Sequence, residues 1–180
     1  MPLQRYIAFL RAVNVGGRIV KMDELREHFA DAGFSDVETF SASGNVIFSS
    51  SAKSTAAAER AIEQHLKKAL GFDVAAFIRT PAGVAAAAAH EPFAAKDIAV
   101  AGASGAAFLK GPLDAAGKKG LAALPSPEDR FVANGGVVYW LSTLKQSETK
   151  LTLVKFERAV GGPATMRSMT SLKKLAAKHC

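Results

Sequence analysis

The sequence predicts an α+β protein made of two tandem ferredoxin-like (βαββαβ) units packed together, with an extra C-terminal helix. Three observations lead to this fold class. The order of strand and helix patterns occurs twice, each repeat contains a hairpin signal, and the strands of the first repeat are apolar on both faces. We expect the first unit over residues 1–80, a helix and connection over 81–104, and the second unit with the extra helix over 105–180.

The first repeat begins with a nearly continuous apolar run over residues 5–11, which predicts a strand. The hairpin signal is Ser43-Gly44-Asn45, which separates two short strand patterns. His65 falls on the inner stripe of a helix and is expected to be a hydrogen-bonded core residue. The remaining elements expected here are a helix, two strands, a helix and a strand, over residues 22–33, 37–40, 46–48, 54–70 and 74–78.

The second repeat follows an alanine-rich helix over 81–90 and a Gly/Ala/Pro-rich connection over 91–104. Its hairpin signal is Asn134-Gly135-Gly136. The two repeats share little residue identity, so the duplication is inferred from order and spacing. The elements expected here are a strand, a helix, two strands, a helix, a closing strand and a final helix, over 106–110, 113–123, 130–133, 137–141, 150–160, 164–166 and 169–178.

Both faces of the first predicted sheet are apolar. In the first strand, Tyr6 and Ala8 lie on one side and Ile7 and Phe9 on the other. A sheet with one wet face should alternate apolar and polar residues, so we expect the second face to be covered by the other half of the chain. This disfavours an RNA-recognition module that stacks bases on an exposed sheet.

The net charge of +7 is concentrated at one end of the chain. Residues 1–140 hold 15 Lys+Arg against 14 Asp+Glu, whereas residues 141–180 hold 8 against 2, giving +6. Such a field attracts polyanions, and the simpler alternative is a solvated basic surface that maintains solubility. We expect no membrane span, because no apolar run has the length that a bilayer requires.

The candidate binding residues come from two bends that the topology should bring together. The exit of the first strand should lie beside the hairpin that starts the third, because those strands are expected to pair antiparallel. An Arg, two Asn, a Ser and glycine amides would suit a phosphate or carboxylate. The alternative is that these residues only stabilise turns. The candidates are Arg11, Asn14, Gly16, Gly17, Ser43, Gly44 and Asn45.

Other chemistries find little support in the sequence. Neither a phosphate-binding loop nor a dinucleotide-binding glycine pattern is present. The four histidines show no i, i+4 pair and no neighbouring cysteine cluster, so we expect neither a metal site nor a cofactor. Gly117-Lys118-Lys119-Gly120 resembles the backbone clamp of KH domains but falls inside a helical pattern. Arg167 precedes the last helix and could hold an anion or form a salt bridge.

Several segments along the chain together form a recognisable pattern. They are Ala8-Phe9-Leu10-Arg11-Ala12-Val13-Asn14-Val15-Gly16-Gly17, Met22-Asp23-Glu24-Leu25, Ala32-Gly33-Phe34, Ser43-Gly44-Asn45-Val46-Ile47-Phe48, Glu91-Pro92-Phe93, Lys150-Leu151-Thr152 and Thr165-Met166-Arg167. With these segments the chain resembles an uncharacterised, mainly bacterial family known as domain of unknown function 1697. The resemblance implies the α+β fold of tandem ferredoxin-like units, and no established activity, substrate or cofactor.

Two positions depart from that family pattern. The family usually has Gly where this chain has Ala12, and it usually has Asn-Trp where this chain has Ser168-Met169. If the Asn-Trp pair serves a ligand, that role is lost or altered here.

We therefore expect an anion-binding module, with nucleic acid favoured as partner by the basic C-terminal region, or a small anionic ligand. One alternative is an enzyme acting on a phosphorylated or carboxylated small molecule, with Arg11 and Arg167 as clamps. The other is a non-catalytic interaction or scaffold protein. The single cysteine, Cys180, favours a cytoplasmic location.

Overall fold

The computed structural model describes residues 2–11, 13–14, 16–41 and 43–180. Within these residues the fold is α+β, with two four-stranded antiparallel sheets and seven helices. None of the helices described combines the length and the apolar character that crossing a bilayer requires.

The chain divides into two compact units. One comprises Met1–Ala85 together with Leu175–Cys180, and the other comprises Ala86–Lys174. The division thus falls inside helix α3 (Pro81–Ala89), and the end of helix α7 (Met169–His179) belongs to the first unit. The sequence instead suggested a separate connection over 81–104 and placed all of α7 in the second unit, and these boundaries stay predictions.

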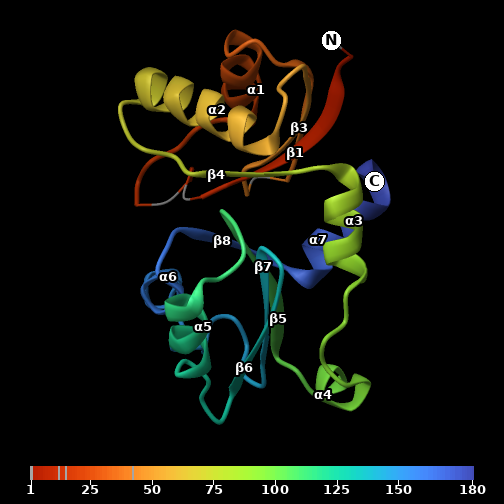
Figure 1. Ribbon diagram of the computed structural model, residues 1–180, viewed down its shortest axis with the longest axis vertical. Helices are drawn as coiled ribbons and strands as arrows, with labels where there is room; N and C mark the ends of the chain where they lie inside the picture. Colours follow the sequence, from red (N-terminus) through yellow and green to blue (C-terminus); the bar gives the residue numbers. More distant parts are fainter. Residues whose placement is uncertain (1, 12, 15, 42) are drawn as a thin grey trace. The chain divides into compact units, whose positions relative to one another are not determined.

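The first unit has the element order β-α-β-β-α-β, and its strands are arranged β2-β3-β1-β4 with antiparallel neighbours. Figure 1 shows both of its long helices on one side of this sheet. The elements are β1 (Gln4–Leu10), α1 (Met22–Asp31), β2 (Ser35–Phe40), β3 (Asn45–Ser50), α2 (Thr55–Leu70) and β4 (Ala76–Arg79).

The core of the first unit forms between the sheet and the helices α1 and α2. Alternate residues of β1, such as Ala8 and Leu10, pack with Leu25 and Phe29 of α1. The residues of the opposite sheet face are fully buried as well, which agrees with the apolar pattern on both sides of the strands: Ile7, Phe9, Ile47 and Phe77.

Local signals set the ends of α2. The Ser54 hydroxyl caps its N-terminus by accepting a hydrogen bond from the Ala57 amide at 3.1 Å. Gly71 ends the helix with φ +78°, a left-handed conformation that costs glycine little. Capping and glycine placement therefore predict the length of this helix.

The second unit repeats the order β-α-β-β-α-β, with strands arranged β6-β7-β5-β8 and antiparallel neighbours. The connection over 91–104 contains a short helix that the sequence pattern did not predict, α4 (Ala95–Ala99). The other elements are β5 (Ala103–Leu109), α5 (Ala115–Ala122), β6 (Asp129–Asn134), β7 (Val137–Ser142), α6 (Leu153–Val160) and β8 (Ala164–Ser168).

Helices α5 and α6 approach each other closely on one side of the second sheet (Figure 1). Gly117 and Gly120 lie at this contact. A Cβ atom added at Gly117 would lie 2.7 Å from the carbonyl oxygen of Val160, and one added at Gly120 would overlap the carbonyl of Ala159. The Gly-Lys-Lys-Gly segment therefore serves helix packing.

Replacing Gly120 with Ala should destabilise the protein although Ala is the better helix former. The added methyl group forces α5 away from the α6 backbone, at a cost of about 1–3 kcal/mol. The Ala preference recovers at most about 1 kcal/mol. We expect the melting temperature, followed by circular dichroism, to fall by several degrees, with Gly162→Ala as control because that site is open. An unchanged or higher melting temperature for Gly120→Ala would contradict the close contact.

Candidate functional site

The two bends expected to meet in the first unit are neighbours in the structure. Strand β1 pairs with β3 so that Phe9 is opposite Asn45, and the Leu10 amide donates to the Gly44 carbonyl at 2.9 Å. Gly44 has φ +77°, and a Cβ atom there would lie 3.3 Å from Cβ of Leu10. A glycine is thus needed where the hairpin turn crosses the end of β1.

Asn45 and Ser43 build the turn between β2 and β3. The Asn45 side chain is 1% exposed. Its amide nitrogen lies 3.0 Å from the Phe40 carbonyl oxygen, 3.3 Å from the Ser41 hydroxyl and 3.2 Å from the Ser43 hydroxyl. These contacts of the Asn45 amide group are internal to the protein, and they hold the turn in shape.

Asn14 closes the loop that follows β1. Its Oδ1 accepts a hydrogen bond from the Val20 amide at 2.7 Å. Val13 and Val20 are 3% and 4% exposed, so both ends of this loop are anchored in the core. The segment between these anchors is exposed at each of its described residues, and Ile19 is 81% exposed.

Gly16 and Gly17 lie in this exposed loop. Their φ angles of +62° and +82° are both left-handed, and a Cβ atom added to either would meet nothing within 4 Å. The loop, residues 11–21, carries Arg11, Arg18 and Lys21 and no acidic residue. We call this segment the glycine loop; its residues Ala12 and Val15 lie outside the described residues.

The two arginines of the glycine loop differ in their surroundings. Arg11 is half-buried, and its backbone amide donates to the Ala75 carbonyl at 2.9 Å. Arg18 is exposed, and its guanidinium lies 4.3 Å from the centre of the Phe72 ring. A cation held over an aromatic ring keeps its outer face available to an anion.

Arg167 lies in the second unit, on β8, and is buried. Its guanidinium donates to the Thr165 hydroxyl at 2.8 Å and to the Met166 carbonyl at 3.0 Å. Burial lowers the pKa of Arg167 to about 10, so the side chain remains protonated at neutral pH. The following residue, Ser168, caps α7 by accepting from the Ser171 amide at 3.1 Å.

The second unit also contains a cavity of about 50 Å³ beside β7. Residues of the motif Glu91-Pro92-Phe93 line it together with Met169 and Lys173. Glu91 and Lys173 form an ion pair at 3.0 Å across the surface. The sequence analysis did not predict this cavity. The Glu91-Pro92-Phe93 motif was the available signal, because its residues line the cavity.

Tyr139 and His90 also line this cavity. The two rings are 4.9 Å apart, and the Tyr139 hydroxyl donates to the Ala87 carbonyl at 2.9 Å. Burial raises the pKa of Tyr139, so the phenol stays protonated and acts as a donor. Met169, which also lines the cavity, stands at the position where the family pattern described above usually has Trp.

Sequence spacing also missed a cluster of histidines and an aspartate in the first unit. His28 and Asp31 on α1 lie beside His65 on α2. The expectation of no metal site rested on the absence of i, i+4 histidine pairs, and that criterion overlooks ligands contributed by two helices. The i, i+3 spacing of His28 and Asp31 was the available signal.

These features define an α+β protein with two four-stranded antiparallel sheets, a glycine-rich basic loop in its first unit and an aromatic cavity in its second. A family model described as a protein of unknown function, DUF1697, matches residues 3–139, and the chain belongs to this family. A solved structure, that of the conserved bacterial protein SP0830 from Streptococcus pneumoniae, is similar with a TM-score of 0.75 and 19% identity, covering 98% of each chain. That similarity concerns the fold. No curated protein matches the chain.

Asn45→Ala should lower the free energy of unfolding by about 1–3 kcal/mol, because the turn loses the buried amide that donates to three of its oxygen atoms. Urea denaturation followed by fluorescence measures this change. Gln64→Ala removes an exposed amide from α2 and should stay within about 0.5 kcal/mol of the wild type. Equal stability of the two variants would contradict the structural role of Asn45.

Met169→Trp should fill the cavity beside β7. Filling about 50 Å³ recovers about 1 kcal/mol, at about 24 cal/mol for each Å³ of cavity. We expect a melting temperature about 2–4 °C higher, measured by scanning calorimetry. A lower melting temperature would show that this cavity cannot accept the larger ring.

Proposed function

We propose that this protein is a binding module for an anionic ligand, nucleic acid in the first place, and that the glycine loop forms its binding surface. The observation that carries the proposal is an exposed segment with two successive left-handed glycines between the buried Val13 and Val20. One basic residue lies within this segment and two flank it: Arg18, Arg11 and Lys21. Binding residues commonly occupy such loops on a rigid scaffold.

The backbone of the glycine loop supports the proposal. Left-handed glycines turn peptide N–H groups toward one side of a loop, where they can donate to the oxygen atoms of a phosphate. The open space around Gly16 and Gly17 leaves room for such a group to approach. An enzyme acting on a phosphorylated small molecule would instead require a closed pocket here, so the open surface favours binding over catalysis.

The charge distribution supports a polyanion. The glycine loop has three basic residues and no acidic one. The first unit holds 11 Lys+Arg against 9 Asp+Glu, giving +2, and the second holds 12 against 7, giving +5. A net positive field accelerates encounter with nucleic acid, while the loop supplies the local contacts.

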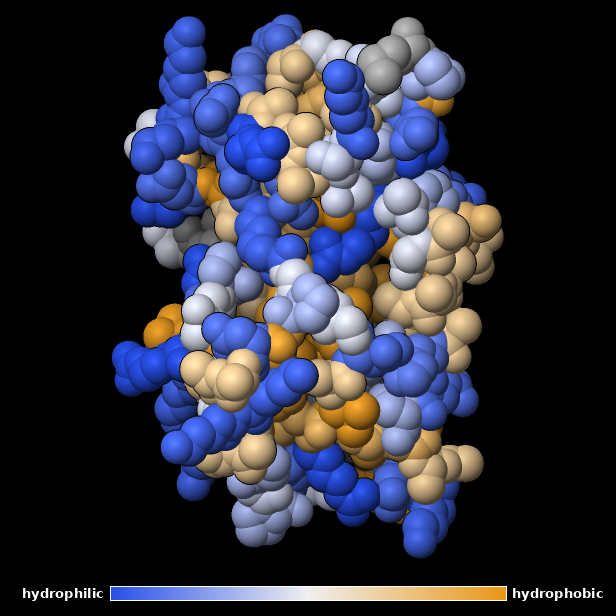
Figure 2. Space-filling model, in the orientation of Figure 1, coloured by the Kyte–Doolittle hydropathy of each residue, from blue (hydrophilic) through white to orange (hydrophobic). Residues whose placement is uncertain are grey.

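The basic side chains late in the chain are mostly on the surface. Figure 2 shows hydrophilic residues over most of the face in view, with smaller hydrophobic areas between them. Of the eight basic residues after position 140, Arg167 is buried and seven are exposed: Lys145, Lys150, Lys155, Arg158, Lys173, Lys174 and Lys178. Exposed lysines and arginines release counterions when they meet phosphates, which gives salt-dependent affinity.

We also propose that the protein consists of two ferredoxin-like units and is located in the cytoplasm. The element order and the strand order of each half are those of the ferredoxin-like split β-α-β plan, which supports two tandem ferredoxin-like units. The exposed free thiol of Cys180 is compatible with a reducing compartment, which supports a cytoplasmic location.

Fluorescence anisotropy with labelled single- and double-stranded oligonucleotides tests the proposal. We expect binding at 50 mM salt that weakens steeply by about 200 mM, because each phosphate contact contributes about 0.9 to the slope of log affinity against log salt concentration. The double variant Arg18→Gln/Lys21→Gln should bind at least about tenfold more weakly and reduce that slope by up to about 1.8.

The matched control removes the same two charges from the exposed surface of α2. Arg60→Gln/Lys68→Gln has the same net charge as the loop variant and should lose much less affinity. Absence of oligonucleotide binding at 50 mM salt would exclude nucleic acid as partner. Equal losses in both double variants would show that the glycine loop has no special part in binding. If binding is absent, melting curves with inorganic phosphate or nucleotides test a small anion instead.

A further inference from the structure

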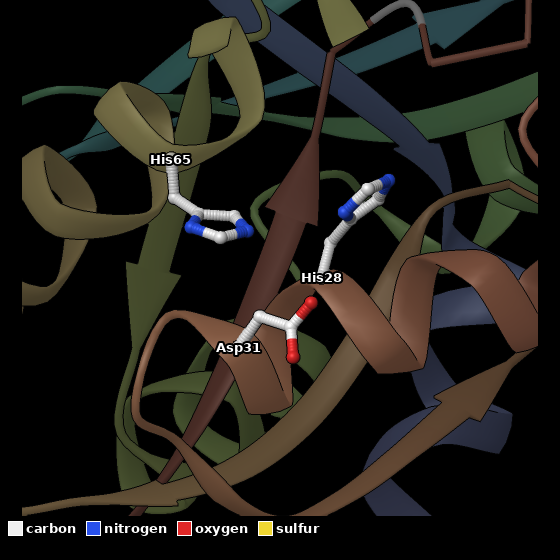
Figure 3. A group of neighbouring side chains, drawn as sticks. All are labelled: His28, Asp31 and His65. Carbon is white, nitrogen blue, oxygen red and sulfur yellow. The ribbon is translucent and has the colours of Figure 1, made fainter. Parts of the chain in front are cut away.

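Three potential metal ligands meet between two helices of the first unit. His28 and Asp31 are three residues apart on α1 and therefore share one side of that helix. His65 comes from the neighbouring helix α2, and its ring turns toward the ring of His28 (Figure 3). One ring nitrogen of each histidine and one carboxylate oxygen of Asp31 lie within 4.8 Å of one another.

We propose that His28, Asp31 and His65 bind a divalent transition-metal ion, zinc in the first place. Two imidazoles and one carboxylate form a ligand set that suits zinc and its transition-metal neighbours, whereas magnesium and calcium prefer oxygen ligands alone. With three protein ligands, a tetrahedral ion keeps one position for water.

The burial of the histidine nitrogens supports a bound ion. The Nε2 atoms of His28 and His65 are buried and have no hydrogen-bond partner. Buried polar atoms in folded proteins nearly always have a partner, and the expectation that His65 is a hydrogen-bonded core residue is not met at this atom. A metal ion at the cluster gives such rings a strong interaction that the protein atoms do not supply.

The spacing of the ligands suits an ion after a small movement. A point equidistant from three atoms that are 4.8 Å apart lies about 2.8 Å from each, whereas zinc binds nitrogen and oxygen ligands at about 2.0–2.2 Å. The ligand atoms therefore need to move inward by less than about 1 Å. Asp31 is exposed, so its side chain is able to make this movement and solvent reaches the site.

The surroundings of His28 fit a metal ligand as well. The two imidazole rings are 5.8 Å apart at their centres, with 60° between their planes, so they are not stacked. Oε1 of Glu24 lies 3.7 Å from Nε2 of His28, one turn earlier on α1. A carboxylate this close to the cluster adds negative charge that attracts a cation.

Metal titration of the full chain tests this site directly. The protein should carry no affinity tag, be stripped with chelator, and contain Cys180→Ser so that the terminal thiol cannot bind the probe. Isothermal calorimetry should give one zinc ion per chain and no binding of magnesium. Zinc at a hundredfold excess over its Kd should raise the melting temperature by about 5 °C or more. Cobalt(II) should develop the visible absorption of a tetrahedral complex.

Four variants separate this cluster from other ligands. His65→Gln and Asp31→Asn should each weaken zinc binding by at least about tenfold. His90→Gln removes a histidine of the second unit, and Glu27→Gln removes an exposed carboxylate of α1 outside the cluster, so both should bind as the parent does. Melting curves without metal establish that each variant is folded. Absence of zinc binding, or equal affinity of His65→Gln and His90→Gln, would overturn the proposal.

Discussion

The antiparallel pairing of β1 with β3 is the interaction on which the proposed anion site depends. It places the end of β1 against the turn before β3, with Phe9 opposite Asn45 and the Leu10 amide bonded to Gly44. β1 is also paired with β4 and is buried on both faces. A shift of one residue would turn every side chain of β1 to the wrong face, so the register is firmly set. The glycine loop thus starts from one of the most constrained positions in the first unit.

The motif residues of the first unit divide into two groups with different roles. Asn14, Gly44 and Asn45 act within the protein, where they close the loop and shape the hairpin turn. Gly16 and Gly17 stand in open space, and their left-handed φ angles are themselves a reason for glycine. Turn chemistry therefore accounts for the residue type in both groups. Exposure distinguishes Gly16 and Gly17 from the internal group, and it is the feature on which the binding proposal rests.

The same segment links the two proposed sites. The glycine loop leads into α1, and α1 carries His28 and Asp31 on the side that meets α2. The acidic residues in its first turn, Asp23 and Glu24, occupy the positive end of the helix dipole. An anion is therefore better placed on the loop than on the helix N-terminus.

Much of the fold was predictable because local signals agree with tertiary packing. Ser54 and Gly71 delimit α2, and the apolar residues of β1 on both faces predicted a sheet buried on two sides. The helix α4 was missed because residues 91–104 have the Gly, Ala and Pro content of a connection. The correct predictions and the missed helix α4 all follow from the composition of the local segment.

The sites were less predictable, since they depend on which residues meet across elements. The pairing of strands allowed the meeting of the end of β1 with the turn before β3 to be anticipated, but the internal use of the Asn45 amide depends on the shape of that turn. The histidine cluster joins residues 37 positions apart, His28 and His65, and no periodicity reports such a contact. From its place before α7, the sequence left Arg167 as either an anion ligand or a salt-bridge partner. Its guanidinium is buried and donates to Thr165 and Met166.

The most direct test of the central claim is an NMR titration of ¹⁵N-labelled protein with a short oligonucleotide at low salt. Binding by the glycine loop predicts that the amide resonances of Gly16 and Gly17 shift first and furthest, together with those of Arg18 and Lys21. Shifts confined to residues of the second unit, with the resonances of Gly16 and Gly17 unmoved at saturation, would contradict it.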